Sequence, residues 1–119
     1  LAVEDGEVNR LVLSHILKKL NADVIMVHDG KQAIEAFEQR EFDLILMDIH
    51  MPVMDGISAT AEIRRLENQS GSKETPIAAV TASVTEAEVD HYKNFGFSHC
   101  IAKPTEQARI QEVIDAIRS

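Results

Sequence analysis

The sequence predicts an α/β domain with one doubly wound, five-stranded parallel sheet. Short apolar runs of strand type alternate five times with longer segments of helical period, and turn-forming residues separate them. This alternation implies parallel strands joined by right-handed crossovers, with helices on both faces of the sheet. The chain has 119 residues, 45% of them hydrophobic, which suffices for one domain that buries roughly two-thirds of its unfolded surface.

The expected elements follow one another in a regular order. Strands are expected at residues 1–4, 23–27, 43–48, 77–80 and 99–102, and helices at residues 7–20, 31–40, 57–68, 85–95 and 105–118. The last helix has the clearest pattern, because Ile110, Val113, Ile114 and Ile117 recur at helical spacing on one face. Residues 68–75 contain turn-forming residues and are expected to form a flexible loop.

The third expected strand ends on an unusual residue. Its apolar run is too short for a helix and leads directly into Asp48, after which a Met-Pro pair and an Asp-Gly pair break the pattern. A carboxylate on a buried strand is costly unless it has a cation, hydrogen-bond donors or a covalent modification. Asp48 is therefore the first candidate for a functional residue.

Charge and cysteine content exclude several classes of function. The net charge of -8, from 12 basic and 20 acidic residues, argues against binding of nucleic acid or of an anionic membrane by this chain alone. The single cysteine, Cys100, excludes an internal disulfide and suits a reducing compartment. No apolar segment is long enough for direct membrane insertion, so we expect a cytoplasmic domain, whose full-length parent can itself be membrane-anchored. Since the chain opens on Leu1, we expect residues 1–119 to be one domain of a longer chain, with a truncated first strand.

Polar residues follow four of the expected strands. In an open parallel sheet, ligands bind outside the carboxyl ends of the strands, so these residues should converge: Glu4, Asp5, Asp48, Thr81 and Lys103. Three crowded carboxylates repel one another, and the usual resolution is a hard divalent cation, here Mg²⁺. Taken singly, each residue has an ordinary structural explanation, such as a strand cap or a solvated charge. Their joint placement favours a site.

A cation beside an aspartate suits phosphoryl transfer. This reaction needs an in-line nucleophile and neutralisation of charge, which Asp48, the metal, Lys103 and the Thr81 hydroxyl could supply. Asp48 would then become an acyl phosphate. Ala82, which follows Thr81, is small enough to leave a path for the incoming group.

Four motifs resemble the receiver domain of two-component response regulators. They are Val-Glu-Asp at the first strand end, Met-Asp-Ile-His-Met-Pro-Val-Met-Asp-Gly at the third, Val-Thr-Ala-Ser at the fourth and Ala-Lys-Pro at the fifth. Their order and spacing match across essentially the whole chain. The opening Glu-Asp-Gly-Glu-Val-Asn-Arg is most similar to receivers attached to hybrid sensor histidine kinases. The resemblance implies a flavodoxin-like (βα)5 receiver fold with strand order 2-1-3-4-5.

The resemblance also implies the chemistry of the site. Asp48 would accept a phosphoryl group from phosphohistidine, on a histidine kinase dimerisation and phosphoacceptor domain or on a histidine phosphotransfer domain. Asp5, Asp48 and the backbone carbonyl of His50 would bind Mg²⁺ directly, and Glu4 would act through water. Lys103 would contact the phosphoryl group.

Further residues would tune and report the phosphorylated state. Thr81 would move toward the phosphoryl group, and Pro104 matches the Lys-Pro pair of the family. Cys100 stands where the family often has an aromatic residue, so coupled movement of a threonine and an aromatic ring is not expected here. By their positions two residues after Asp48 and after Thr81, His50 and Ser83 are expected to set the lifetime of the phosphorylated state.

The first expected helix carries more apolar residues than one buried stripe needs. If Val12, Leu13, Ile16, Leu17 and Leu20 face the sheet, Val8 and Leu11 remain exposed beside Asp48, with His15 one turn further on. We expect this strip to dock an amphipathic helix of the phosphodonor. The alternative is that a neighbouring loop or domain covers the strip.

Three other functions compete with this one. A haloacid dehalogenase-like phosphatase also uses an aspartate, magnesium, a threonine and a lysine, but needs a second aspartate where His50 stands and its nucleophile on the first strand. A flavin carrier would bind phosphate at the first loop, where Glu4 and Asp5 would repel it. An unphosphorylated pseudo-receiver would serve only as an interaction module, and the complete set of acidic residues, Thr81 and Lys103 argues against it.

Overall fold

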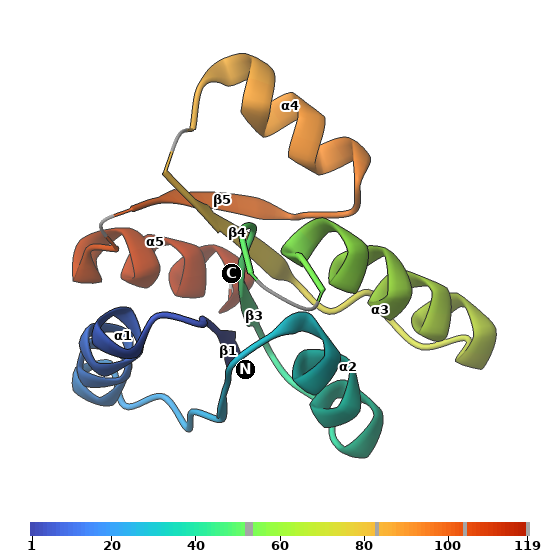
Figure 1. The fold of residues 1–119 in the computed structure, drawn as a ribbon, viewed down its shortest axis with the longest axis horizontal. Coiled ribbons are helices and arrows are strands. Elements are labelled where there is room, and N and C mark those ends of the chain that lie inside the picture. Colours follow the sequence, from blue (N-terminus) through green and yellow to red (C-terminus); the bar gives the residue numbers. More distant parts are fainter. Residues whose placement is uncertain (52–53, 83, 104, 119) are drawn as a thin grey trace.

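The computed structural model describes residues 1–51, 54–82, 84–103 and 105–118. It contains one five-stranded parallel sheet in the order β2-β1-β3-β4-β5 (Figure 1). The strands are β1 (Ala2–Val3), β2 (Met26–Val27), β3 (Ile45–Asp48), β4 (Ile77–Thr81) and β5 (His99–Ala102). The predicted fold class and strand order are confirmed. The first two strands are shorter than expected, since only two residues of each pair in the sheet.

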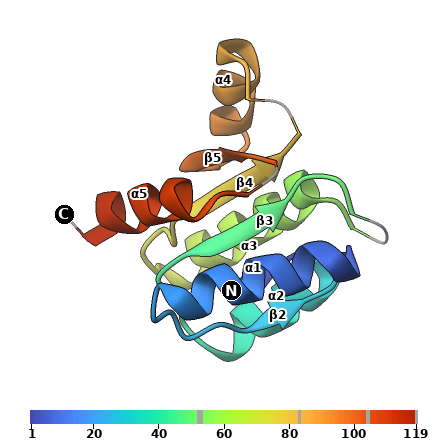
Figure 2. The ribbon, with the colours of Figure 1, turned by 90° about the vertical axis from the view of Figure 1, so that its left-hand side faces the viewer.

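Helices cover both faces of the sheet (Figures 1 and 2). They are α1 (Glu7–Lys19), α2 (Gly30–Gln39), α3 (Gly56–Ser70), α4 (Glu86–Asn94) and α5 (Gln107–Arg118). Among the described residues, none of these helices has the length and apolar character that a membrane crossing requires.

Alternation along the strands divides the buried residues into two cores. Ala2, Leu46 and Ile101 pack with α1 and α5, whereas the strand residues next to them in sequence, such as Val3 and Met47, pack with α2, α3 and α4. Successive side chains of a strand point to opposite faces, so a sheet covered on both sides needs apolar residues at nearly every strand position. This explains why the strands appear in the sequence as continuous apolar runs.

Side chains fix the beginnings of three helices. Asp29, Asp55 and Thr85 each accept a hydrogen bond from the backbone N–H three residues on, at 2.9, 2.7 and 3.3 Å. α3 continues to Ser70 and ends at Gly71, whose φ of 71° lies in the left-handed region. The loop expected at residues 68–75 therefore begins three residues too early.

The apolar arc of α1 is only partly buried. Leu13, Ile16 and Leu17 face the core, as expected, while Val8 and Leu11 are 72% and 69% exposed. The expectation for Val12 is wrong, because it is 49% exposed. Val12 lies about 100° around the helix from Leu13, at the edge of the buried stripe.

Candidate active site

Asp48 ends β3 at the carboxyl edge of the sheet and is only 1% exposed. The loop that follows returns tightly against the strand, since the Gly56 N–H donates to the Ile49 carbonyl at 3.0 Å. A Cβ at Gly56 would lie 2.2 Å from the Asp48 carbonyl oxygen, so no other residue fits without a backbone shift. Gly56 thus holds the loop against the strand end that carries Asp48.

Two groups donate hydrogen bonds to the Asp48 carboxylate. Lys103 Nζ donates to Asp48 Oδ2 at 3.1 Å, and the backbone N–H of His50 donates to Asp48 Oδ1 at 3.2 Å. Lys103 Nζ also lies 3.5 Å from Glu4 Oε2, so it bridges two buried carboxylates. The Lys103 N–H donates to the Thr81 carbonyl at 2.8 Å, which fixes the lysine at the end of β5.

Burial and neighbouring charges shift the acid–base behaviour of this pair. Burial raises the pKa of Asp48 to about 6; the hydrogen bond from Lys103 opposes this shift, and the charge of Glu4 adds to it. Burial alone would lower the pKa of Lys103, but its contacts with Asp48 and Glu4 outweigh burial and raise it. The site therefore carries a costly negative charge that a further cation would stabilise.

The carboxylates are arranged to accept such a cation. One oxygen each from Glu4, Asp5 and Asp48 lies within 4.8 Å of the others. Glu4 is buried, and its Oε1 accepts hydrogen bonds from the Gly6 N–H at 3.1 Å and from Asn9 Nδ2 at 3.4 Å, whereas Asp5 is exposed. An oxygen donor set with one solvent-facing carboxylate suits a hard, partly hydrated ion such as Mg²⁺.

The remaining predicted residues lie around this cluster or outside the described residues. Thr81 is buried at the end of β4, and Ala82 next to it is exposed. The His50 side chain is exposed, and Cys100 is buried within β5. Ser83 and Pro104, expected to tune lifetime and switching, lie outside the described residues.

The expected docking strip begins on the helix that follows the acidic pair. His15 is exposed like Val8 and Leu11, and Val12 extends the strip. A hollow of about 340 Å³ lies beside it between α1 and β2, where Arg10 contacts His28. The sequence reasoning missed the contact of Arg10 with His28, since a pairing between residues 18 apart leaves no periodic signal.

The sequence pattern also gave no prediction for Asn9, which donates to Glu4, or for Gly56, which lies against the backbone of Asp48. For Gly56, the Asp-Gly pair was a usable signal, because such pairs mark tight turns.

Residues 1–115 match the family described as the response regulator receiver domain. The chain is 34% identical to the sensor protein GacS of Pseudomonas syringae and 37% identical to the histidine-protein kinase BarA of Escherichia coli, in both cases over 96% of this chain. It spans only 13% and 12% of the lengths of these relatives.

Solved structures share the fold. The receiver domain of the sensor histidine kinase PA1611 from Pseudomonas aeruginosa has a TM-score of 0.86 and 38% identity, covers 99% of this chain and 95% of its own, and has a magnesium ion coordinated in its active-site cleft. The receiver domain of Ssk1 from Saccharomyces cerevisiae, in complex with the histidine phosphotransfer protein Ypd1, has a TM-score of 0.88 and 28% identity; it covers 95% of this chain and 83% of its own.

These matches decide against the dehalogenase-like phosphatase that the sequence left open. Asp48 lies on β3 rather than on the first strand, and His50 stands where a dehalogenase-like phosphatase needs its second aspartate. The family match covers nearly the whole chain, and the strand order agrees with it. The chain belongs to the response regulator receiver domains, the phosphorelay modules of two-component signalling.

Proposed function

We propose that Asp48 is the phosphoacceptor of this receiver domain. The observation that carries the proposal is the buried Asp48 carboxylate, which contacts Lys103 and lies within 4.8 Å of oxygens from Glu4 and Asp5. A carboxylate oxygen of Asp48 attacks the phosphorus of a phosphohistidine. The P–N bond breaks, its electron pair returns to the imidazole nitrogen, and an acyl phosphate forms on Asp48.

Mg²⁺ belongs to the same proposal. Asp5, Asp48 and the His50 carbonyl would hold the ion directly, and Glu4 would hold one of its waters; the magnesium in the PA1611 receiver supports this assignment. When bound, the ion neutralises charge on the transferring phosphoryl oxygens. Lys103 holds its ammonium at the same edge of the sheet and would move from Asp48 Oδ2 to a phosphoryl oxygen.

Thr81 would move toward the phosphoryl group and signal its presence, and Ala82 would leave space for the group to enter. Thr81 is buried at the end of the strand next to β3, where a small displacement brings its hydroxyl toward a group on Asp48. Ala82 is exposed and small, which keeps the approach open. Cys100, within β5, and Pro104, which lies outside the described residues, would be associated with this switch.

His50 would influence how long the acyl phosphate survives. Its side chain is exposed two residues after Asp48, where it would flank the path of the hydrolytic water. Ser83 is assigned the same role by its place after Thr81. Replacement of either residue should change the rate of dephosphorylation in magnesium buffer, and an unchanged rate for either one would reject the assignment.

The phosphodonor would dock on the exposed strip of α1, formed by Val8, Leu11 and His15 and extended by Val12. Its candidates are a histidine phosphotransfer domain, as in the complex of Ypd1 with Ssk1, or the dimerisation domain of a histidine kinase. The relatives include a histidine-protein kinase, which supports a place within a hybrid histidine kinase. A position on the cytoplasmic side belongs to the same proposal. The full coding sequence tests this architecture. If it encodes no histidine kinase domain in the same chain as residues 1–119, the architecture is rejected.

The decisive experiment is phosphoryl transfer from a purified phosphohistidine donor in magnesium buffer. Wild type should acquire an acid-stable, base-labile label that chelation of Mg²⁺ suppresses. Asp48→Asn should acquire none, and Asp23→Asn, which removes an exposed carboxylate elsewhere, should behave as wild type. Label that persists in Asp48→Asn would overturn the assignment, and absence of label in wild type would favour the interaction module.

A further inference from the structure

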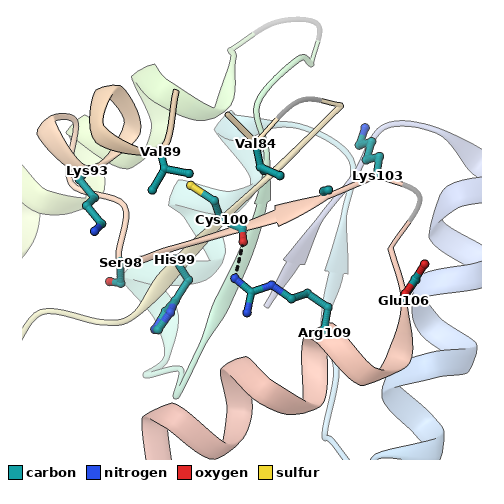
Figure 3. A pocket seen from close by; sticks show the side chains of 10 residues that line it. Val84, Val89, Lys93, Ser98, His99, Cys100, Lys103, Glu106 and Arg109 are labelled. Carbon is teal, nitrogen blue, oxygen red and sulfur yellow. Dashed lines mark hydrogen bonds between the residues drawn. The ribbon is translucent and has the colours of Figure 1, made fainter. Parts of the chain in front are cut away.

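A groove of about 610 Å³ lies between α4 and α5, over the edge strand β5. Figure 3 shows Val84 and Val89 near the Cys100 thiol above β5, Lys93 beyond Val89 at the left, and His99 and Arg109 below β5. The groove therefore has an apolar part and a cationic part.

The cationic part is partly fixed in place. Arg109 Nη2 donates to the Cys100 carbonyl at 2.9 Å, which holds the guanidinium against β5 (Figure 3). Arg109 Nη1 contacts Glu112 Oε2 at 3.1 Å. Lys93 projects from the last turn of α4, and His99 begins β5. Their side chains thus approach the groove from three elements.

Charges in the groove act on one another. Burial lowers the pKa of His99, and the positive charges of Arg109 and Lys93 lower it further. Burial raises the pKa of the Cys100 thiol, and the same two cations oppose that shift. Arg109 and Lys93 therefore both lie close enough to His99 and Cys100 for their positive charges to act toward a lower pKa of each. Glu106 is the one carboxylate among the described lining residues, and of the three lining cations Arg109 pairs with Glu112 and Lys103 with Asp48, which leaves Lys93 outside the ion pairs of the described residues.

We propose that this groove binds a small organic anion, with its phosphate or carboxylate between Lys93, His99 and Arg109 and its apolar part against Val84 and Val89. The volume falls within the range of roughly 300–1,000 Å³ that is usual for small-molecule sites. Clustered cations also recognise phosphate and carboxylate through charge-assisted hydrogen bonds. Lys103 lines the end of the groove and contacts Asp48, so the ligand would lie next to the acidic site without occupying it.

The test is a titration of ¹⁵N-labelled domain followed by NMR, in magnesium-free buffer without phosphodonor. Three probes separate the two parts of the site: phenyl phosphate carries both groups, inorganic phosphate only the anion, and benzyl alcohol only the ring. Phenyl phosphate should bind more tightly than either of the others, and the amide shifts should centre on Val89, His99 and Arg109. Because neither Mg²⁺ nor phosphorylation is involved, the result is independent of the role proposed for Asp48.

Matched charge variants make the test specific. Lys93→Gln should weaken phenyl phosphate binding about three- to fivefold, and Lys93→Arg should retain it. Lys73→Gln removes an exposed lysine from the loop before β4 and should have no effect. Equal affinity for phenyl phosphate and inorganic phosphate, shifts centred away from the groove, or equal effects of Lys93→Gln and Lys73→Gln would each overturn the proposal.

Discussion

Asp48 carries a charge that its own fold opposes. It is 1% exposed and lies beside Glu4, and its contact with Lys103 compensates only in part, since its pKa remains raised to about 6. Asp48, the proposed phosphoacceptor, therefore destabilises the folded state of the metal-free protein. Such a conflict between stability and function is common at active sites.

This conflict predicts how the stability of the metal-free domain depends on pH. The folded pKa of about 6 lies above the ordinary value of 3.8, so the folded state binds more protons between these values. The contribution of Asp48 to the free energy of unfolding is therefore fully favourable below about pH 3.8 and is lost as pH rises through about 6.

Asp48→Asn removes the pH-dependent contribution of the Asp48 carboxyl group to the free energy of unfolding. Thermal unfolding in chelator, followed by circular dichroism, should show a higher Tm for the variant than for wild type at neutral pH, and a smaller difference near pH 4. Asp23→Asn is the control for loss of a carboxylate elsewhere. A wild-type advantage that grows with pH would contradict the prediction.

At the scale of single elements, α1 carries a buried and an exposed set of apolar residues, and the exposed set is the proposed docking surface. Leu13, Ile16 and Leu17 hold the helix on the sheet, and Val8, Leu11 and Val12 remain exposed. Because the exposed residues contribute little to the core, they can be changed without loss of the fold.

Leu11→Glu should slow phosphoryl transfer from the protein donor about tenfold or more, because it places a charge in the docking surface. Transfer from a small phosphodonor such as acetyl phosphate should stay at the wild-type rate. Phe95→Glu, at the end of α4, adds the same charge on a different surface and controls for net charge. Equal losses with both donors would show that Leu11 acts on the site rather than on docking.

A second element-scale feature connects α3 to the turn before β5. Arg64 donates to the Gly96 carbonyl through Nη2 at 2.7 Å and contacts Glu67 Oε1 at 2.7 Å. The buried Glu67 accepts from the Thr75 N–H at 2.6 Å through its other oxygen. Removal of one charge from such a pair leaves the other buried and unpaired.

Arg64→Leu should therefore lower the free energy of unfolding by about 3 kcal/mol, measured by urea denaturation. Adding Glu67→Gln should recover part of the loss, since a neutral amide still accepts from Thr75 but carries no unpaired charge. The exposed pair of Arg65 with Glu62 is the control, and Arg65→Leu should change stability little. A double variant less stable than Arg64→Leu would reject the charge argument.

The sequence predicted most of the fold and the acidic site for physical reasons. A sheet buried on both faces requires apolar runs, and parallel strands bring their carboxyl ends together, so strand order and strand-end residues could be inferred. The contacts of Arg64 and the groove between α4 and α5 could not be inferred from the sequence. They bring together residues that are distant in sequence and share no common pattern. The prediction that Val12 faces the sheet was wrong because the edge of the buried stripe depends on how α1 is rotated about its own axis.

At the scale of the whole molecule, cation binding at the proposed site would be coupled to folding. Ligands that bind only the folded state stabilise it, by about 2.7 kcal/mol at a concentration 100 times the dissociation constant. Mg²⁺ should therefore raise the Tm. The increase should be larger at about pH 7.5 than at about pH 5, since protons compete for Asp48.

Calorimetry with and without Mg²⁺ at the two pH values checks this prediction. Asp5→Asn should lose most of the increase, and Asp23→Asn should keep it. A Tm shift of equal size in Asp5→Asn and wild type would indicate general salt stabilisation instead of a site.

Burial of the only cysteine gives the domain a built-in measure of its own opening. Cys100 lies within β5, and burial raises the pKa of its thiol, so thiol reagents should react slowly with the folded domain. Because Cys100 also lines the groove between α4 and α5, each reaction event would record entry of the reagent through that groove, separation of α4 from the edge of the sheet or complete unfolding. The rate of thiol labelling would thus compare the accessibility of this edge with and without Mg²⁺ and phosphodonor, without any introduced label.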